Sequence, residues 1–292
     1  MSPTYRSFAK INLHLEVLGK RKDGYHQLRT VFQTVDLCDL VTIELSDGGV
    51  ELDVEEEKVP SGPENLAHKA ATAFLERWAP ARGVRIRLRK TIPVGGGLGG
   101  GSSNAATVLL ALQELLDSPA PPRELGSVAR SLGADVPYFL IGGTALGTGR
   151  GDEIETLEEL PETEIWLVIP PVSISTAEVF AQFAELTPKA GKSSIESLAE
   201  GRISSWLASG KGWNDLQELV VSRYPEVGAV YNALCEAGAS EIKLSGSGAT
   251  LFARFSDPCV SRHLARHLPP ASGLVRALTL TRSSCQRLRI VK

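Results

Sequence analysis

Residues 93–104 read Pro93-Val94-Gly95-Gly96-Gly97-Leu98-Gly99-Gly100-Gly101-Ser102-Ser103-Asn104. The run follows a strand-like segment and opens a segment with helical spacing. Glycine tolerates unusual backbone conformations, so backbone N–H groups can turn toward one point. A helix N-terminus adds unsatisfied N–H groups and partial positive charge. The run therefore predicts a phosphate-binding loop, with a flexible surface loop as the alternative.

Two common phosphate loops do not match this run. A Walker A motif needs Gly-Lys-Ser/Thr, and residues 93–104 contain no lysine. Gly95-x-Gly97-x-x-Gly100 fits the dinucleotide fingerprint, as many glycine runs do. That fingerprint expects a strand with an acidic end about 20 residues later, where this chain has the proline-rich run 119–122. Dinucleotide binding is therefore rejected.

Upstream of the loop, residues 9–17 alternate between apolar and polar side chains. Side chains of a strand alternate between its faces, so this segment is predicted to be a half-buried strand. Lys10 and Asn12 share its polar face, which either contacts a ligand or lies in solvent. Residues 102–116 carry an apolar stripe at helical spacing, which predicts a helix after the glycine run.

Composition narrows the class of protein. The chain has 292 residues, 42% of them hydrophobic, and a net charge of −3. Its length allows one large domain or two smaller ones, and its charge disfavours a nucleic-acid binder. It has no apolar run long enough for a membrane span and no apolar signal segment, so we expect a cytoplasmic protein. Its four cysteines lie far apart in the sequence and are expected to be reduced thiols.

Strands and helices do not alternate regularly, which predicts an α+β protein in two parts. Segment 93–106 moreover resembles the signature loop of the GHMP small-molecule kinases. Four further segments match that family in the expected order: residues 9–13, 23–26, 133–139 and 244–249. The resemblance implies the two-domain GHMP kinase fold. A ribosomal-protein-S5-like α/β domain would span residues 1–155, and a ferredoxin-like α+β domain would span residues 156–292.

The asparagine and additional glycines of the loop, with Asp23-Gly24-Tyr25-His26, resemble one branch of this family. Its members use ATP, with Mg²⁺, to phosphorylate the C2 hydroxyl of a cytidine-diphosphate-linked methylerythritol in the non-mevalonate isoprenoid route. A GHMP kinase acting on a sugar, homoserine or mevalonate is the nearest alternative, and Tyr25-His26 argues against it. A non-catalytic nucleotide sensor is the other alternative, which the presence of both Lys10 and Asp135 disfavours.

The resemblance also implies the roles of particular residues. Asp135 would accept the proton of the hydroxyl and Lys10 would stabilise negative charge, although Asp135 also suits a helix cap or turn. ATP would be bound by Pro93, Val94, Gly95, Gly96, Gly97, Leu98, Gly99, Gly100, Gly101, Ser102, Ser103 and Asn65. The substrate would be bound by Asn12, Tyr25, His26 and Phe180. Phe180 would be the second aromatic wall of a base slot, or else a core residue. No direct metal ligand and no oligomeric state is predicted.

Overall fold

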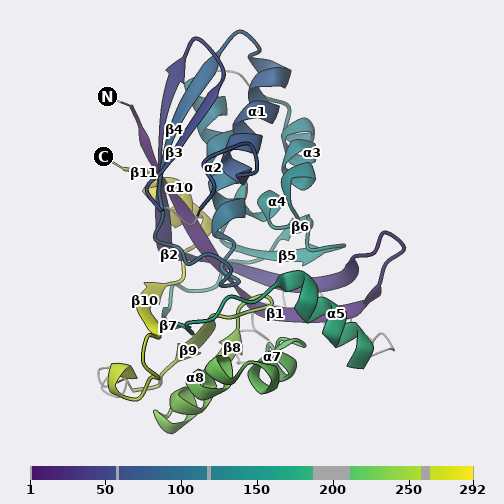
Figure 1. The fold of residues 1–292 in the computed structure, drawn as a ribbon, viewed down its shortest axis with the longest axis vertical. Helices are drawn as coiled ribbons and strands as arrows, with labels where there is room; N and C mark the ends of the chain where they lie inside the picture. The colour runs from purple at the N-terminus through teal and green to yellow at the C-terminus, as the bar shows by residue number, and fades with distance from the viewer. Residues whose placement is uncertain (1, 57–58, 117–119, 187–210, 258–263, 292) are drawn as a thin grey trace.

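The computed structural model describes residues 2–56, 59–116, 120–186, 211–257 and 264–291. Two β-sheets, each with its own helices, meet beside the long strands β1 and β2 (Figure 1). The first sheet contains β1 (Thr4–Lys20), β2 (His26–Ser46), β3 (Val50–Val54), β4 (Gly83–Arg89), β5 (Thr144–Thr148), β6 (Glu153–Thr156) and β11 (Ile290–Val291). Its strand order is β11-β1-β2-β4-β3, and β5 pairs with both β2 and β6.

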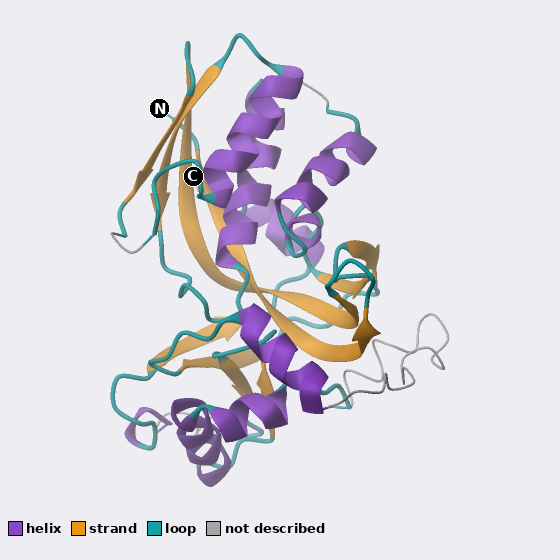
Figure 2. Cartoon of the chain, turned by 45° about the vertical axis from the view of Figure 1, so that its right-hand side comes forward, coloured by secondary structure: helices purple, strands orange, loops and turns teal. Residues whose placement is uncertain are grey.

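Helices cover one face of this sheet (Figure 2). They are α1 (Leu66–Trp78), α2 (Gly100–Leu115), α3 (Pro122–Leu132) and the one-turn α4 (Val136–Phe139). Strand β4 shows why this face is covered: Val84, Ile86 and Leu88 are buried against α1 and α2, while the arginines between them are exposed. The predicted helix after the glycine run is confirmed, and it begins at Gly100.

The second sheet is antiparallel, with strand order β10-β7-β9-β8. Its elements are β7 (Glu164–Ile169), β8 (Glu241–Leu244), β9 (Leu251–Arg254), β10 (Gly273–Leu278), α5 (Thr176–Leu186), α7 (Gln217–Arg223), α8 (Pro225–Glu236) and η2 (Leu264–Arg266). Helix α5 lies beside the far end of the β1–β2 hairpin (Figures 1 and 2). Its side chains therefore reach the first sheet.

The end of the chain returns from the second sheet to the first. After β10, residues 279 and 280 pair with β2, and α10 (Arg282–Leu288) follows. Strand β11 then pairs with the beginning of β1. The domain boundary between residues 155 and 156 stays a prediction, and the first sheet also includes this C-terminal segment.

Two further sequence expectations concern the whole chain. The cysteines among the described residues, Cys38, Cys235 and Cys285, are free thiols, as predicted, and Cys259 lies outside the described residues. In the part of the chain that the structure describes, no helix is both long and apolar enough to span a membrane.

Candidate active site

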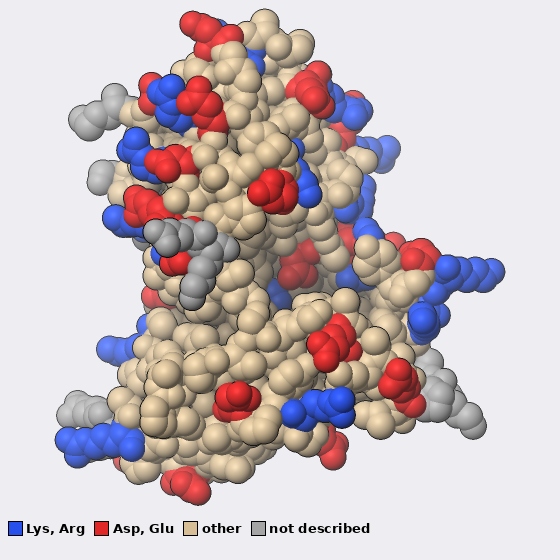
Figure 3. Space-filling model, viewed as in Figure 1, with Lys and Arg blue, Asp and Glu red and all other residues tan. Residues whose placement is uncertain are grey.

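A cavity of about 1190 Å³ opens where the two sheets, the start of α2, the turn before α4 and helix α5 come together. Figure 3 shows this face hollowed between the two parts, with acidic and basic side chains in the hollow. The volume exceeds the range of about 300–1,000 Å³ typical of one small-molecule site. The cavity can therefore hold two ligands together. Its lining includes every residue assigned to a site from the sequence except Ser103.

The glycine loop forms one wall, and it needs glycine for two reasons. Gly95, Gly97 and Gly99 have φ of +72°, +75° and +70°, a region that other residues rarely adopt. A Cβ on Gly97 would lie 2.1 Å from the Ser245 carbonyl oxygen, so backbone from the second sheet packs directly on the loop. Helix α2 begins after Gly99 without a side-chain cap. Its first-turn N–H groups are thus available for an anion.

A buried polar cluster that the sequence did not reveal anchors this loop. Asp39 of β2 is fully buried, and its carboxylate accepts hydrogen bonds from the backbone N–H groups of Thr91 (2.7 Å) and Ile92 (2.8 Å). The same carboxylate pairs with the Lys90 ammonium and accepts the Asn104 amide at 2.9 Å. A buried ion pair is tolerated when its remaining polar groups are bonded in this way. The cluster ties the residues before the loop to the first turn of α2.

Ser103 is the member of the predicted ATP-binding set that does not line the cavity, and its part in ATP binding stays a prediction. Its side chain is buried, and its hydroxyl donates to the Phe8 carbonyl at 2.6 Å and accepts from Ser7 at 2.8 Å. Its backbone N–H bonds to the Gly99 carbonyl. Ser103 therefore fastens α2 to β1, and it faces away from the cavity lined by Ser102.

Lys10 and Asp135 come together on the cavity floor. The Lys10 ammonium lies 3.7 Å from the Asp135 carboxylate and donates to the Asn12 side-chain oxygen at 2.6 Å. Burial lowers the pKa of Lys10, and the charge of Asp135 opposes that shift. The Asp135 side chain is 33% exposed, so its carboxylate is accessible from the cavity. Asp135 also precedes α4 at its N-terminus without capping it through its side chain.

A second glycine turn, residues 245–248, brings the other sheet to this pair. A Cβ on Gly246 would lie 3.2 Å from the Lys10 ammonium nitrogen. The Ser245 hydroxyl donates to the Gly97 carbonyl at 2.9 Å, which joins the two glycine turns. Buried Asn214, which the sequence did not single out, donates to the carbonyls of Leu244 (2.9 Å) and Gly246 (2.7 Å). Asn214 therefore fixes the turn from behind.

Replacing this asparagine tests the anchoring of the turn. We expect Asn214→Ala to lower the free energy of unfolding by about 2–3 kcal/mol, because two buried carbonyls lose their donor. Denaturant unfolding measures the change. Ser222→Ala, which removes an exposed hydroxyl from α7, is the control, with an expected change within about 0.5 kcal/mol. Equal stability of the two variants would contradict the anchoring role.

The aromatic residues lie at the far end of the cavity. The rings of His26 and Phe180 stack directly, with centroids 5.2 Å apart and an interplanar angle of 23°. A base between two rings needs a separation of roughly 7 Å, which is two van der Waals contacts. A base therefore cannot lie between these two rings unless they part, but it can stack on an outer face of Phe180. The base slot with Phe180 as its second aromatic wall stays a prediction. Burial and the charge of Lys20 lower the pKa of His26, which favours a neutral ring that can donate and accept hydrogen bonds.

Tyr25 and Asn65 have partners within the protein. Tyr25 is 55% exposed, and the Arg150 guanidinium lies 4.8 Å from its ring centroid while also pairing with Asp152. Asn65 is the N-cap of α1: its side chain accepts from the Ala67 N–H (2.9 Å) and donates to the Pro60 carbonyl (2.7 Å). Asn65 lines the cavity, and its adenine contact stays a prediction.

The chain matches known proteins along most of its length. Residues 65–143 match the model of the GHMP kinases N terminal domain, and residues 194–268 match GHMP kinases C terminal. A 4-diphosphocytidyl-2-C-methyl-D-erythritol kinase of Geobacter sulfurreducens is 43% identical over 87% of this chain and 90% of its own. The Pelotomaculum thermopropionicum protein of the same name is 41% identical, over 88% and 90% of the two chains.

Solved structures agree with these relatives. A crystal structure titled 4-(cytidine 5'-diphospho)-2C-methyl-D-erythritol kinase superposes with a TM-score of 0.79 at 34% identity, covering 94% of this chain and 98% of that one. A homoserine kinase from Cytophaga hutchinsonii reaches a TM-score of 0.68 at 19% identity, covering 96% and 94% of the two chains. That second likeness shows the shared fold alone.

Proposed function

The chain belongs to the 4-diphosphocytidyl-2-C-methyl-D-erythritol kinases within the GHMP kinase superfamily, and from this membership we propose its reaction. It transfers the γ-phosphoryl group of ATP to the C2 hydroxyl of 4-diphosphocytidyl-2-C-methyl-D-erythritol. The products are the 2-phosphate and ADP, in the non-mevalonate route to isoprenoid precursors. The observation that carries the proposal is one cavity that contains the glycine loop, the Lys10–Asp135 pair and the aromatic end.

In this proposal the residues of the cavity floor handle the proton and the charge. Phosphoryl transfer depends mainly on positioning the reactants and stabilising charge. Asp135 accepts the proton of the C2 hydroxyl as the phosphoryl group arrives, since its carboxylate is accessible from the cavity. Lys10, 3.7 Å away, stabilises the negative charge on the reacting oxygens. Asn12 holds the Lys10 ammonium in place through its 2.6 Å hydrogen bond.

The proposal assigns the triphosphate to the first turn of α2 and the cytidine end to the aromatic residues. Uncapped N–H groups after Gly99 bind the phosphates, and Lys10 and Gly246 lie where the two substrates meet. At the other end of the cavity, aromatic faces stack on the base and the neutral His26 ring reads its polar edge.

Magnesium is part of the proposal. The oxygen donors on this part of the cavity wall, the Asp135 carboxylate and the Ser102 hydroxyl, suit Mg²⁺, which takes most of its ligands from phosphates and water. These two side chains would hold the ion, which would neutralise charge on the phosphates. The free cysteines suit a reducing compartment, and we place the reaction in the cytoplasm.

A coupled ADP-release assay tests the substrate. We expect turnover with the cytidine compound and none with mevalonate or homoserine at the same concentration, since those small acyclic molecules offer no base to the aromatic end. Turnover with either of them but not with the cytidine compound would refute the proposal. ADP release with none of the three would favour the non-catalytic nucleotide sensor.

The aromatic end can be tested separately from the chemistry. We expect Phe180→Leu to raise the KM for the cytidine substrate about tenfold and to leave the KM for ATP unchanged, because base stacking is worth about 1–3 kcal/mol. Phe183→Leu is the matched control on the same helix. Phe183 packs against the hydrophobic core formed by the second sheet and its helices, and it does not line the cavity. Equal KM values for the two variants would remove Phe180 from base recognition.

A further inference from the structure

The turn that carries Asp135 needs support from outside itself. Among the described residues, the Asp135 carboxylate has one ion-pair partner, the Lys10 ammonium at 3.7 Å. The following helix, α4, has only four residues. An isolated turn of that length is not stable on its own. The orientation of Asp135 therefore depends on what holds α4 from behind.

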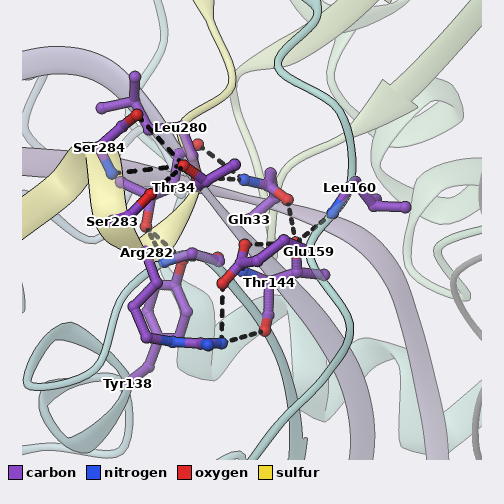
Figure 4. A network of polar contacts seen from close by, with 12 residues as sticks. Gln33, Thr34, Tyr138, Thr144, Glu159, Leu160, Leu280, Arg282, Ser283 and Ser284 are labelled. Carbon is purple, nitrogen blue, oxygen red and sulfur yellow. Dashed lines mark hydrogen bonds and ion pairs between the residues drawn. The ribbon is translucent and has the colours of Figure 1, made fainter.

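Tyr138, three residues after Asp135, provides such a hold. Its side chain is fully buried, and its hydroxyl lies 2.7 Å from the Thr34 hydroxyl and donates to the Gly143 carbonyl at 2.8 Å. The Thr34 hydroxyl also accepts the Gly143 N–H at 3.0 Å. Residues 138–143 connect α4 to β5. These bonds attach both ends of that segment to strand β2 (Figure 4).

The ring of Tyr138 connects the same turn to Lys10. It stacks on Phe32, with centroids 4.7 Å apart, and the Lys10 ammonium lies 5.7 Å from the Phe32 centroid. The next residue, Phe139, lies so close to Gly99 that a Cβ there would be 2.8 Å from its ring. Helix α4 thus packs against the supports of both Lys10 and the glycine loop.

The C-terminal segment fixes Thr34 in turn (Figure 4). The Leu280 N–H bonds to the Thr34 carbonyl at 2.9 Å, and the Leu280 carbonyl accepts the Gln33 side-chain amide at 2.8 Å. Arg282 donates to the Thr144 carbonyl at 3.1 Å and pairs with Glu159 at 2.9 Å. Residues 280–282 therefore hold β2 and β5 on either side of the Thr34–Tyr138 contact.

We propose that Tyr138 is a positioning residue for the phosphoryl transfer. Its hydroxyl, held by Thr34 and through Thr34 by residues 280–282, keeps the Asp135 carboxylate in place beside Lys10. The inference rests on the proposed function, because it assigns a role to the support of Asp135. It also gives the segment after β10 a part in the reaction.

Tyr138→Phe tests the inference, since it removes the hydroxyl and keeps the ring on Phe32. We expect kcat to fall at least about tenfold, because small displacements of reacting groups are costly. The KM values for ATP and for the cytidine substrate should change less than about twofold, since neither substrate touches Tyr138. Tyr5→Phe is the matched control: Tyr5 is equally buried, and its hydroxyl has no hydrogen-bond partner among the described residues. Its kcat should equal that of the wild type.

Changes at Thr34 separate positioning from general support of the fold. Thr34→Val removes the hydroxyl at nearly constant shape and should reproduce the loss of kcat. Thr34→Ser restores the hydroxyl and should restore kcat, even where its thermal stability is lower than that of the valine variant. Wild-type kcat in Tyr138→Phe, or equal kcat in the serine and valine variants, would overturn the positioning role of Tyr138 and leave the proposed function standing. Absence of turnover in the wild-type protein would overturn the proposed function and this inference together.

Discussion

Asp135→Asn should lower kcat by about 10³-fold or more while ATP still binds, because general-base catalysis contributes about 10²–10⁴-fold. The amide has the size of the carboxylate and cannot take a proton from the C2 hydroxyl. The charge of Asp135 also opposes the lowering of the Lys10 pKa by burial, so its loss favours the neutral amine, which cannot balance the charge of the transferred group. ADP release measures turnover, and titration with a non-hydrolysable ATP analogue measures nucleotide binding.

The control for this variant is a carboxylate outside the cavity. Asp53→Asn changes an exposed side chain of β3 that pairs with Arg87, and such surface pairs contribute little. It should keep wild-type kcat. Near-normal turnover in Asp135→Asn would remove Asp135 from the mechanism. If Asp135→Asn lost both nucleotide binding and turnover, Asp135 would instead be assigned to binding ATP.

Gly97→Ala should weaken ATP binding by about 10²-fold or more, since a misplacement of about 1 Å has effects of that size. Gly97 has φ of +75°, and its Cβ would lie 2.1 Å from the Ser245 oxygen and 2.8 Å from the Gly248 oxygen. Both are backbone atoms, so the two glycine turns must move apart. The change displaces the loop before α2 and separates Gly246 from Lys10. Isothermal titration with the ATP analogue measures the affinity.

Gly126→Ala is the control for that substitution. Gly126 lies inside α3, where a Cβ would meet only the end of the Arg130 side chain at 3.9 Å. Alanine favours a helix over glycine by up to about 1 kcal/mol, so this variant should be slightly more stable with unchanged ATP affinity. If the two alanine variants bound ATP with equal affinity, ATP binding would not require the two glycine turns to pack closely.

Local sequence patterns predicted the parts of the site that depend on local geometry. Lys10 and Asn12 share one face because strand side chains repeat every two residues, and both line the cavity. The glycine run predicted a loop before a helix, which the structure has. The different placement of Ser103 also follows from local geometry, because neighbouring helical residues point in directions about 100° apart. With Ser102 facing the cavity, Ser103 faces β1.

The unpredicted parts depend on partners far apart in the sequence. Asp39 joins Lys90 and Asn104, and Asn214 joins Gly246, through contacts that the topology creates. Periodicity cannot identify such pairs, because it reports only which face a side chain occupies. The contact between His26 and Phe180 is of the same kind: both residues were predicted to bind the substrate, but their stacking on each other was not predicted. The return of residues 280–291 to the first sheet had no signal in the sequence either.

The most direct test is a crystal structure with 4-diphosphocytidyl-2-C-methyl-D-erythritol and a non-hydrolysable ATP analogue bound together. The triphosphate should lie on the backbone amides of the loop and of the first turn of α2. The C2 hydroxyl oxygen should lie within about 3 Å of the Asp135 carboxylate, in line with the γ-phosphorus. A γ-phosphate bound away from residues 95–102, or a C2 hydroxyl far from Asp135, would contradict the account.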